Sequence, residues 1–146
     1  YSMSKHAVEA FTDALAAEMA RVGVKVSVIE PGNYQSDMGR NVVRRMEERG
    51  KKIEGSMFET ELRGLFNSVA AESRDPKPDD VAQAALHAVF DPAPKARYLV
   101  VPNQRQAEVT IRKQIMELVQ LNEGHAFSYS RDSLVSLLDQ ALKRPK

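Results

Sequence analysis

Cysteine is absent from the 146-residue chain, and no long apolar run occurs in it. Without cysteine there are no disulfides, thiolate metal ligands or cysteine nucleophiles. A membrane-spanning helix needs about 18 or more consecutive apolar residues, and nothing here approaches that length. An excess of charge is also lacking, since 21 basic residues against 20 acidic residues give a net charge of +1. The chain therefore has no general electrostatic footprint for nucleic acid, and we expect no nucleic-acid partner.

Hydrophobic residues make up 42% of the chain and charged residues 28%, with 7 glycines and 7 prolines. This composition is typical of one folded domain and excludes intrinsic disorder as a global description.

The first third of the chain predicts a helix followed by a strand. Apolar residues recur at helical spacing over 2–22, and Gly23 is suited to end that helix. Residues 24–29 alternate and are rich in valine, which predicts a strand that Pro31 and Gly32 stop. A helix that runs directly into a strand is typical of the second half of a βαβ unit. We therefore expect a parallel partner strand, and a natural N-terminal segment, before Tyr1.

The remainder of the chain is mainly helical, with one further strand over 97–101. Asp79 or Asp80 is predicted to cap one helix, and Ser130 to cap the last. Two strands among several helices favour the C-terminal half of a larger α/β fold. The alternative is a mostly helical domain in which the two strands pair. The predicted helices after Gly32 cover 38–49, 57–72, 79–91, 104–121 and a last segment that ends at Leu142.

A phenol and an ammonium lie four residues apart at Tyr1 and Lys5, and such residues share one face of a helix. A tyrosine hydroxyl titrates near pH 10, and a nearby ammonium stabilises its phenolate form. That combination suits proton transfer to a carbonyl or from an alcohol. On its own, the spacing more often reflects a tyrosine that starts a helix and a solvated lysine.

The surrounding sequence makes the pair more informative. Residues 1–36, YSMSKHAVEAFTDALAAEMARVGVKVSVIEPGNYQS, resemble the short-chain dehydrogenase/reductase family. The runs SKHAVEAFTDAL and VIEPGN are most similar to its retinol and 17β-hydroxysteroid dehydrogenase branch, and KPDDVAQAALHAV and RYLVVP resemble the family's late helix and final strand.

The resemblance implies an α/β fold, namely the C-terminal part of a Rossmann-like, doubly wound parallel sheet with a helical substrate lid and a helical C-terminal extension. It divides this single domain into four parts. Residues 1–37 form the catalytic helix, strand and Pro-Gly loop, residues 38–76 the substrate lid, residues 77–103 the late helix and last strand, and residues 104–146 the C-terminal extension.

The resemblance also implies roles for individual residues. Tyr1 matches the catalytic acid/base, and Lys5 matches the lysine that assists it and contacts the nicotinamide ribose. The cofactor is NAD or NADP, and the choice between them is not readable, because the glycine-rich turn and the residues that select the cofactor would precede Tyr1. The upstream catalytic serine would precede it too. The expected cofactor-binding residues are Tyr1, Lys5, Pro31, Gly32, Asn33 and Ser36.

The implied function is an NAD(P)-dependent oxidoreductase that interconverts a lipophilic secondary alcohol, such as a steroid or retinoid, and its ketone. The alternative is a non-catalytic Rossmann-like protein that binds a nucleotide or a partner. We expect a cytoplasmic homo-oligomer, a dimer or tetramer formed through the helix over 2–22, with membrane attachment through a preceding segment left open. No metal site is expected, because His6, His87 and His125 are widely separated.

Two further patterns each have two interpretations. Basic residues over 40–52 form either a solvated helix face or an attractive surface for an anionic substrate or membrane. Apolar residues over 38–66 line a substrate pocket or belong to an ordinary core. The basic residues are Arg40, Arg44, Arg45, Arg49, Lys51 and Lys52.

Overall fold

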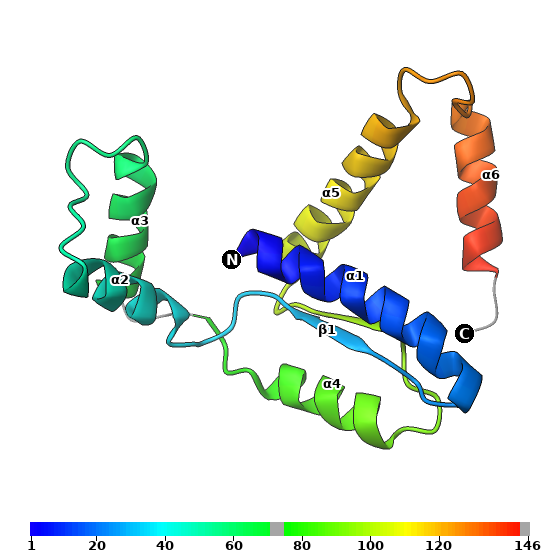
Figure 1. Ribbon diagram of the computed structural model, residues 1–146, viewed down its shortest axis with the longest axis horizontal. Coiled ribbons are helices and arrows are strands. Elements are labelled where there is room, and N and C mark those ends of the chain that lie inside the picture. The colour runs from blue at the N-terminus through cyan, green and yellow to red at the C-terminus, as the bar shows by residue number, and fades with distance from the viewer. Residues whose placement is uncertain (71–74, 144–146) are drawn as a thin grey trace.

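A computed structural model of the chain describes residues 1–70 and 75–143. Its elements confirm the predicted α/β class, with helices flanking two strands (Figure 1). In order, they are α1 (Ser2–Met19), the 3₁₀ turn η1 (Ala20–Val22), β1 (Val28–Pro31), α2 (Met38–Glu48), α3 (Glu59–Ala70), α4 (Asp79–Phe90), β2 (Arg97–Val100), α5 (Gln104–Asn122) and α6 (Arg131–Leu142).

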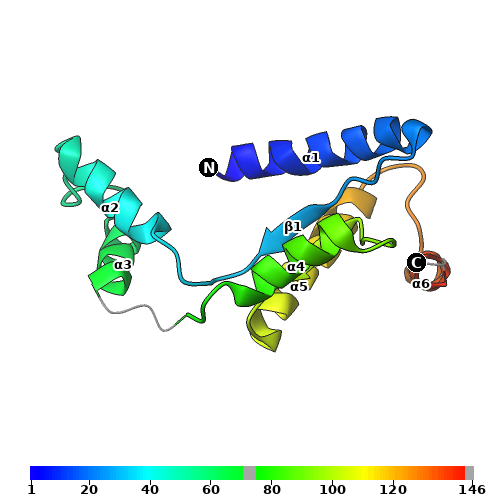
Figure 2. The same ribbon diagram turned by 90° about the horizontal axis from the view of Figure 1, so that it is seen from below.

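The two strands pair in parallel, in a register that runs from Val28 opposite Arg97 to Pro31 opposite Val100. Helix α1 lies on one side of this sheet and α4 on the other (Figure 2). A parallel pair with helices on both faces is the arrangement of a doubly wound fold. The partner strand that we expect before Tyr1 stays a prediction.

The first strand is displaced from its predicted position. We expected it over 24–29, but the ladder begins only at Val28. In this register Pro94 lies opposite residue 25 and has no backbone N–H to donate, and the neighbouring Lys95 N–H donates to the Tyr98 hydroxyl. Residues 25 and 27 are held there by side-chain bonds instead, with Lys25 Nζ 2.6 Å from the Pro92 carbonyl oxygen and Ser27 Oγ 2.8 Å from that of residue 95.

The helix ends follow the sequence signals in part. Gly23 ends the first helical segment in the left-handed conformation (φ 72°), as predicted, after α1 tightens into η1. Ser130 caps α6 as predicted, because its side chain accepts the Ser133 N–H. The predicted cap at Asp79 or Asp80 is wrong. Pro78 occupies the N-cap, and both aspartates lie in the first turn of α4. Their negative charge there interacts favourably with the positive end of the helix dipole.

Helices α2 and α3 form a pair that lies apart from the sheet (Figures 1 and 2). They approach closely at Gly39, where a Cβ atom would lie 2.8 Å from Val69 Cγ2. The helix predicted over 57–72 begins at Glu59, and its last two residues lie outside the described residues.

Few apolar side chains are buried in the described part of the chain. The buried ones are Val28 and Tyr98 on the two strands and Tyr34 in the segment after β1. The hydroxyl of Tyr98 accepts the Lys95 N–H at 2.9 Å and bonds His87 Nδ1 at 2.8 Å, which ties β2 to α4. Large apolar side chains on the outer faces of α1 and α4, such as Phe11 and Phe90, are exposed. Within residues 1–70 and 75–143, no helix has both the length and the apolarity needed to cross a membrane.

Candidate functional site

The candidate site lies at the carboxyl end of the two strands. Because β1 and β2 are parallel, both strands end at the same edge of the sheet. The start of α1 lies at this end in both views (Figures 1 and 2). Ligands of open α/β sheets bind outside the carboxyl ends of the strands, so this edge is where the sequence predicts chemistry.

Tyr1 and Lys5 stand together on the first turn of α1. The ammonium of Lys5 lies over the Tyr1 ring, 5.3 Å from its centroid, a distance at which a cation is attracted to an aromatic face. The backbone is regular here, because the Lys5 N–H donates to the Tyr1 carbonyl oxygen at 3.1 Å and Ser4 Oγ donates to the same oxygen at 2.7 Å. Tyr1 is 75% exposed, so the phenol is available to a ligand.

The turn after β1 is held tightly against the end of β2. Gly32 donates its N–H to the Val100 carbonyl oxygen at 2.7 Å, which extends the strand pairing by one residue. A Cβ atom at Gly32 would lie 2.4 Å from Gln106 Oε1 and 2.9 Å from Val101 Cγ1. A larger residue at this position would therefore displace the Gln106 side chain and crowd Val101.

A cavity of about 650 Å³ opens at this turn. Both strand ends and the first turns of α5 form its wall, so it offers backbone groups beside apolar side chains, as many ligand sites do. Three of the predicted cofactor residues, Pro31, Gly32 and Asn33, line it, whereas Tyr1, Lys5 and Ser36 are not part of its wall. The lining residues are Glu30, Pro31, Gly32, Asn33, Leu99, Val101, Asn103, Arg105, Gln106, Val109 and Thr110.

The segment that follows the turn is anchored to α4. Tyr34 is buried, and its hydroxyl lies 3.4 Å from Asp80 Oδ2. Burial, together with the negative charge of Asp80, raises the pKa of Tyr34, so this phenol stays neutral. The Gln35 N–H donates to the Pro76 carbonyl oxygen at 2.9 Å. Ser36, which comes next, is exposed.

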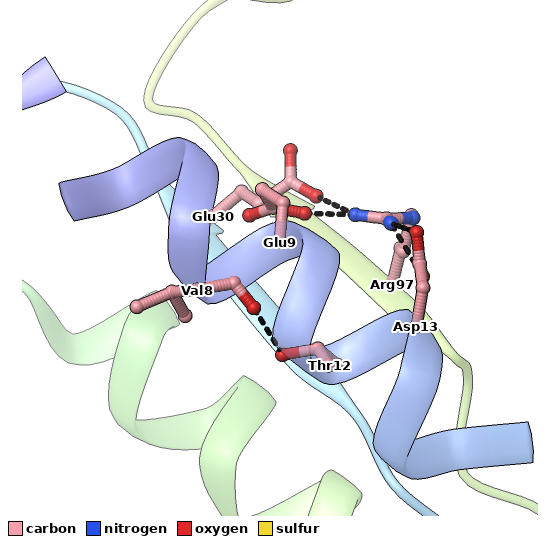
Figure 3. Close-up of polar contacts among 6 residues, drawn as sticks. All are labelled: Val8, Glu9, Thr12, Asp13, Glu30 and Arg97. Carbon is pink, nitrogen blue, oxygen red and sulfur yellow. Dashed lines mark hydrogen bonds and ion pairs between the residues drawn. The ribbon is translucent and has the colours of Figure 1, made fainter. Parts of the chain in front are cut away.

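An ion-pair cluster fastens α1 to the sheet (Figure 3). The guanidinium of Arg97 on β2 contacts three carboxylates, Glu9 and Asp13 on α1 and Glu30 on β1. Its Nη2 donates to both oxygens of Asp13 at 2.7 and 2.8 Å, and its Nη1 donates to Glu30 Oε1 at 3.0 Å and to Glu9. The hydrogen bond to Glu9 is the main cause that raises the pKa of Arg97 above its ordinary value.

Sequence reasoning gave no role to Arg97 or Gln106. Arg97 contacts partners 67 to 88 positions away, and Gln106 accepts a hydrogen bond from Asn33, 73 positions away. Asn103 followed three residues later by glutamine is a helix-start signal, because the Asn103 side chain accepts the Gln106 N–H. That signal predicts the beginning of α5 but not the contact of the Gln106 side chain with Asn33.

The histidines are not grouped. His87 bonds Tyr98 and lies 3.4 Å from Asp91 Oδ2, while His6 is exposed. Over 1–70 and 75–143, no three histidine or acidic side chains are arranged to hold a metal ion.

Comparisons with known proteins identify the family of this chain. The short chain dehydrogenase family profile matches residues 1–47, which contain Tyr1, Lys5 and the turn after β1. A mouse protein named short-chain dehydrogenase/reductase family 9C member 7 is 34% identical over 111 residues, covering 67% of this chain and 34% of that protein. No solved structure matches the chain at a significant level.

Two shorter similarities fall in the branch that the sequence runs indicated. Mouse 17-beta-hydroxysteroid dehydrogenase type 6 is 55% identical over 38 residues, covering 26% of this chain and 12% of that protein. Rat retinol dehydrogenase 16 is 45% identical over 42 residues, covering 29% and 13%. The chain spans about a third of the length of the first of these relatives. On the matching profile and these relatives, which confirm the resemblance and its branch, the chain belongs to the short-chain dehydrogenase/reductase family.

Proposed function

We propose that this chain carries the catalytic tyrosine and lysine of an NAD(P)-dependent oxidoreductase that interconverts an alcohol and a carbonyl compound. The observation that carries the proposal is the family match over residues 1–47, within which Tyr1 and Lys5 lie together at the carboxyl end of the sheet. The names of the relatives, several of them dehydrogenases, support the same class of reaction.

The residues at the strand ends fit a nicotinamide cofactor. The absence of a side chain at Gly32 lets Gln106 and Val101 pack against the backbone of the turn, and Asn33 lines the cavity beside it. Pro31, Gly32 and Asn33 would hold the nicotinamide end, with Lys5 at the ribose and Ser36 supplying a hydroxyl. When bound, NAD or NADP supplies or accepts the hydride.

Tyr1 moves the proton. Its hydroxyl donates to the carbonyl oxygen during reduction, and its phenolate takes the alcohol proton during oxidation. Lys5, whose ammonium lies 5.3 Å from the centroid of the Tyr1 ring, supplies the positive charge that assists this proton transfer.

We propose a lipophilic secondary alcohol as substrate. Two relatives are named for a steroid and for retinol, and Met57 and Phe58, at the start of the α3 region, expose apolar side chains at 90% and 60%. In this proposal residues 38–76 form the lid over the substrate. The protein assembles as a dimer or tetramer through α1, whose outward apolar side chains include Met3 and Phe11.

The test uses Tyr1→Phe and Lys5→Ala in the natural full-length protein, with Tyr129→Phe and Lys113→Ala as matched controls at exposed positions. Tyr1→Phe should lower turnover by about 10²–10⁴-fold, the usual contribution of general acid–base catalysis. Lys5→Ala should shift the pH–rate profile of alcohol oxidation to higher pH and weaken cofactor binding.

Both controls should keep the activity and pH profile of the wild type. Near-normal turnover in Tyr1→Phe, or an unshifted profile in Lys5→Ala, would show that the pair is only a helix start. Cofactor binding without turnover of any alcohol would instead favour a non-catalytic nucleotide-binding protein.

A further inference from the structure

The turn that would receive the nicotinamide end is held from the C-terminal extension. The Asn33 N–H donates to Gln106 Oε1 at 2.7 Å, a contact between the loop after β1 and the first turn of α5. We propose that Gln106 is a positioning residue, which fixes the 31–33 turn in the shape that binds the nicotinamide ring and its carboxamide. This inference rests on the proposed function and adds a role for α5 in the cofactor site.

Gln106 is itself well placed to hold the turn. Its backbone N–H donates to Asn103 Oδ1 at 3.1 Å, and its carbonyl oxygen accepts Thr110 Oγ1 at 3.0 Å. The residue is half-buried in the cavity wall. These bonds fix the backbone position from which the Gln106 side chain reaches the turn.

The packing around Gly32 supports a positional role. A Cβ atom placed at Gly32 would lie 2.4 Å from Gln106 Oε1 and 2.9 Å from Val101 Cγ1, so both side chains pack closely against the turn. The Gly32 N–H is bound to Val100, so the turn is held by β2 on one side and by α5 on the other. Removing the acceptor at Gln106 takes away this partner of the Asn33 N–H, and the turn is then no longer held by α5.

The experiment compares two ligands that differ only in the presence of the nicotinamide group. NADH or NADPH, whichever the wild type prefers, carries the nicotinamide, whereas the matching ADP-ribose lacks it. Affinities are measured by titration calorimetry on the natural full-length protein, without substrate. Because both ligands carry the same phosphates, their affinity ratio cancels general changes in charge or folding.

Gln106→Met keeps the length of the side chain and removes the acceptor, whereas Gln106→Glu keeps an acceptor oxygen. Gln104→Met, at an exposed neighbouring position, is the control. Loss of one hydrogen bond should weaken binding of the reduced dinucleotide about three- to tenfold in Gln106→Met. Binding of ADP-ribose should stay within about twofold, and Gln106→Glu and the control should keep the wild-type ratio.

An unchanged ratio in Gln106→Met, or an equal loss for both ligands, overturns the inference while the proposed function stands. Tighter binding of the dinucleotide also overturns it, because Gln106 would then compete for the Asn33 N–H. A wild type that binds neither ligand refutes the proposed function and the inference with it. If Gln106→Met does not fold, Gln106→Asn, which shortens the reach by one methylene, should show the same selective loss, and an unchanged ratio there is equally contrary.

Discussion

Replacing Arg97 by methionine should loosen the attachment of α1 to the sheet. Methionine keeps much of the length and apolar volume of arginine, so the change removes mainly the charge and its hydrogen bonds. It leaves Glu9, Asp13 and Glu30 near one another without their shared cation. The expected loss therefore combines missing attraction with new repulsion.

The magnitude follows from exposure and geometry. The side chain of Arg97 is 44% exposed and those of Glu9 and Glu30 are about a third exposed, so solvent screens these two pairs only in part; Asp13 is 68% exposed, so its pair is screened more strongly. Exposed ion pairs contribute about 0.2–1 kcal/mol each, and pairs that share one guanidinium are not additive. For Arg97→Met we expect a loss of about 1–3 kcal/mol in the free energy of unfolding at low salt.

Urea unfolding of the natural full-length protein between low salt and 1 M NaCl measures this loss. The Debye length falls from about 10 Å at 0.1 M to about 3 Å at 1 M, so the loss should shrink by roughly half. Adding Glu9→Gln to Arg97→Met should recover part of it, because one of the unpaired carboxylates is then neutral. Arg112→Met is the matched control, since Arg112 makes one exposed pair with Glu108 and should cost below about 1 kcal/mol.

A loss that is independent of salt would refute the electrostatic reasoning and point to packing of the arginine stem. Failure of the Glu9→Gln addition to recover stability would show that repulsion among the carboxylates contributes nothing. Equal losses in Arg97→Met and the Arg112 control would show that the cluster is no stronger than an isolated surface pair.

Three further predictions concern other parts of the molecule. The Gly55 N–H, together with Arg63, lowers the pKa of Glu59 below 4.5, so this stabilisation is present above that pH and is lost as pH falls through the lowered value. Amide exchange in α3 should therefore be faster in Glu59→Gln than in wild type at pH 7, and the difference should disappear as pH falls through the lowered pKa of Glu59; equal rates at pH 7 would contradict the assignment. If residues 38–70 cover the substrate, their amides should exchange faster than those of α1 without substrate and slow down with it, and unchanged exchange would count against a lid. Because so few apolar side chains are buried among the described residues, the 146 residues expressed alone should bind an apolar dye and unfold over a broad range, whereas a sharp transition would show that they form a sufficient core.

Local signals predicted the elements well where one interaction decides the outcome. Gly23 adopts the left-handed conformation at the end of η1, and Ser130 caps α6 through the Ser133 N–H. The signals failed where a distant segment decides. The first strand begins at Val28 because, on the opposite segment, Pro94 has no N–H and the Lys95 N–H donates to Tyr98. Asp80 lies in the first turn of α4, near the hydroxyl of Tyr34, and does not cap the helix.

The candidate site divides in the same way. The spacing of Tyr1 and Lys5 on one helical face was readable, because four residues complete about one turn of any α-helix. The glycine at position 32 was readable as part of the Pro-Gly turn. The partners that confine it were not, because Gln106 reaches it from another element.

The sequence by itself thus determined which segments of this chain form helices and strands and the pairing of a phenol with an ammonium, since each depends on neighbours along the chain. It did not determine where β1 begins. The tertiary structure alone decided the parallel register of β1 and β2, the joining of α1 to the sheet through Arg97 and the bond from Gln106 to the 31–33 turn. These contacts join residues 69 to 88 positions apart in the chain. No local pattern specifies such partners, because they meet only when parallel strands align their carboxyl ends and bring the loops and helix starts to one edge.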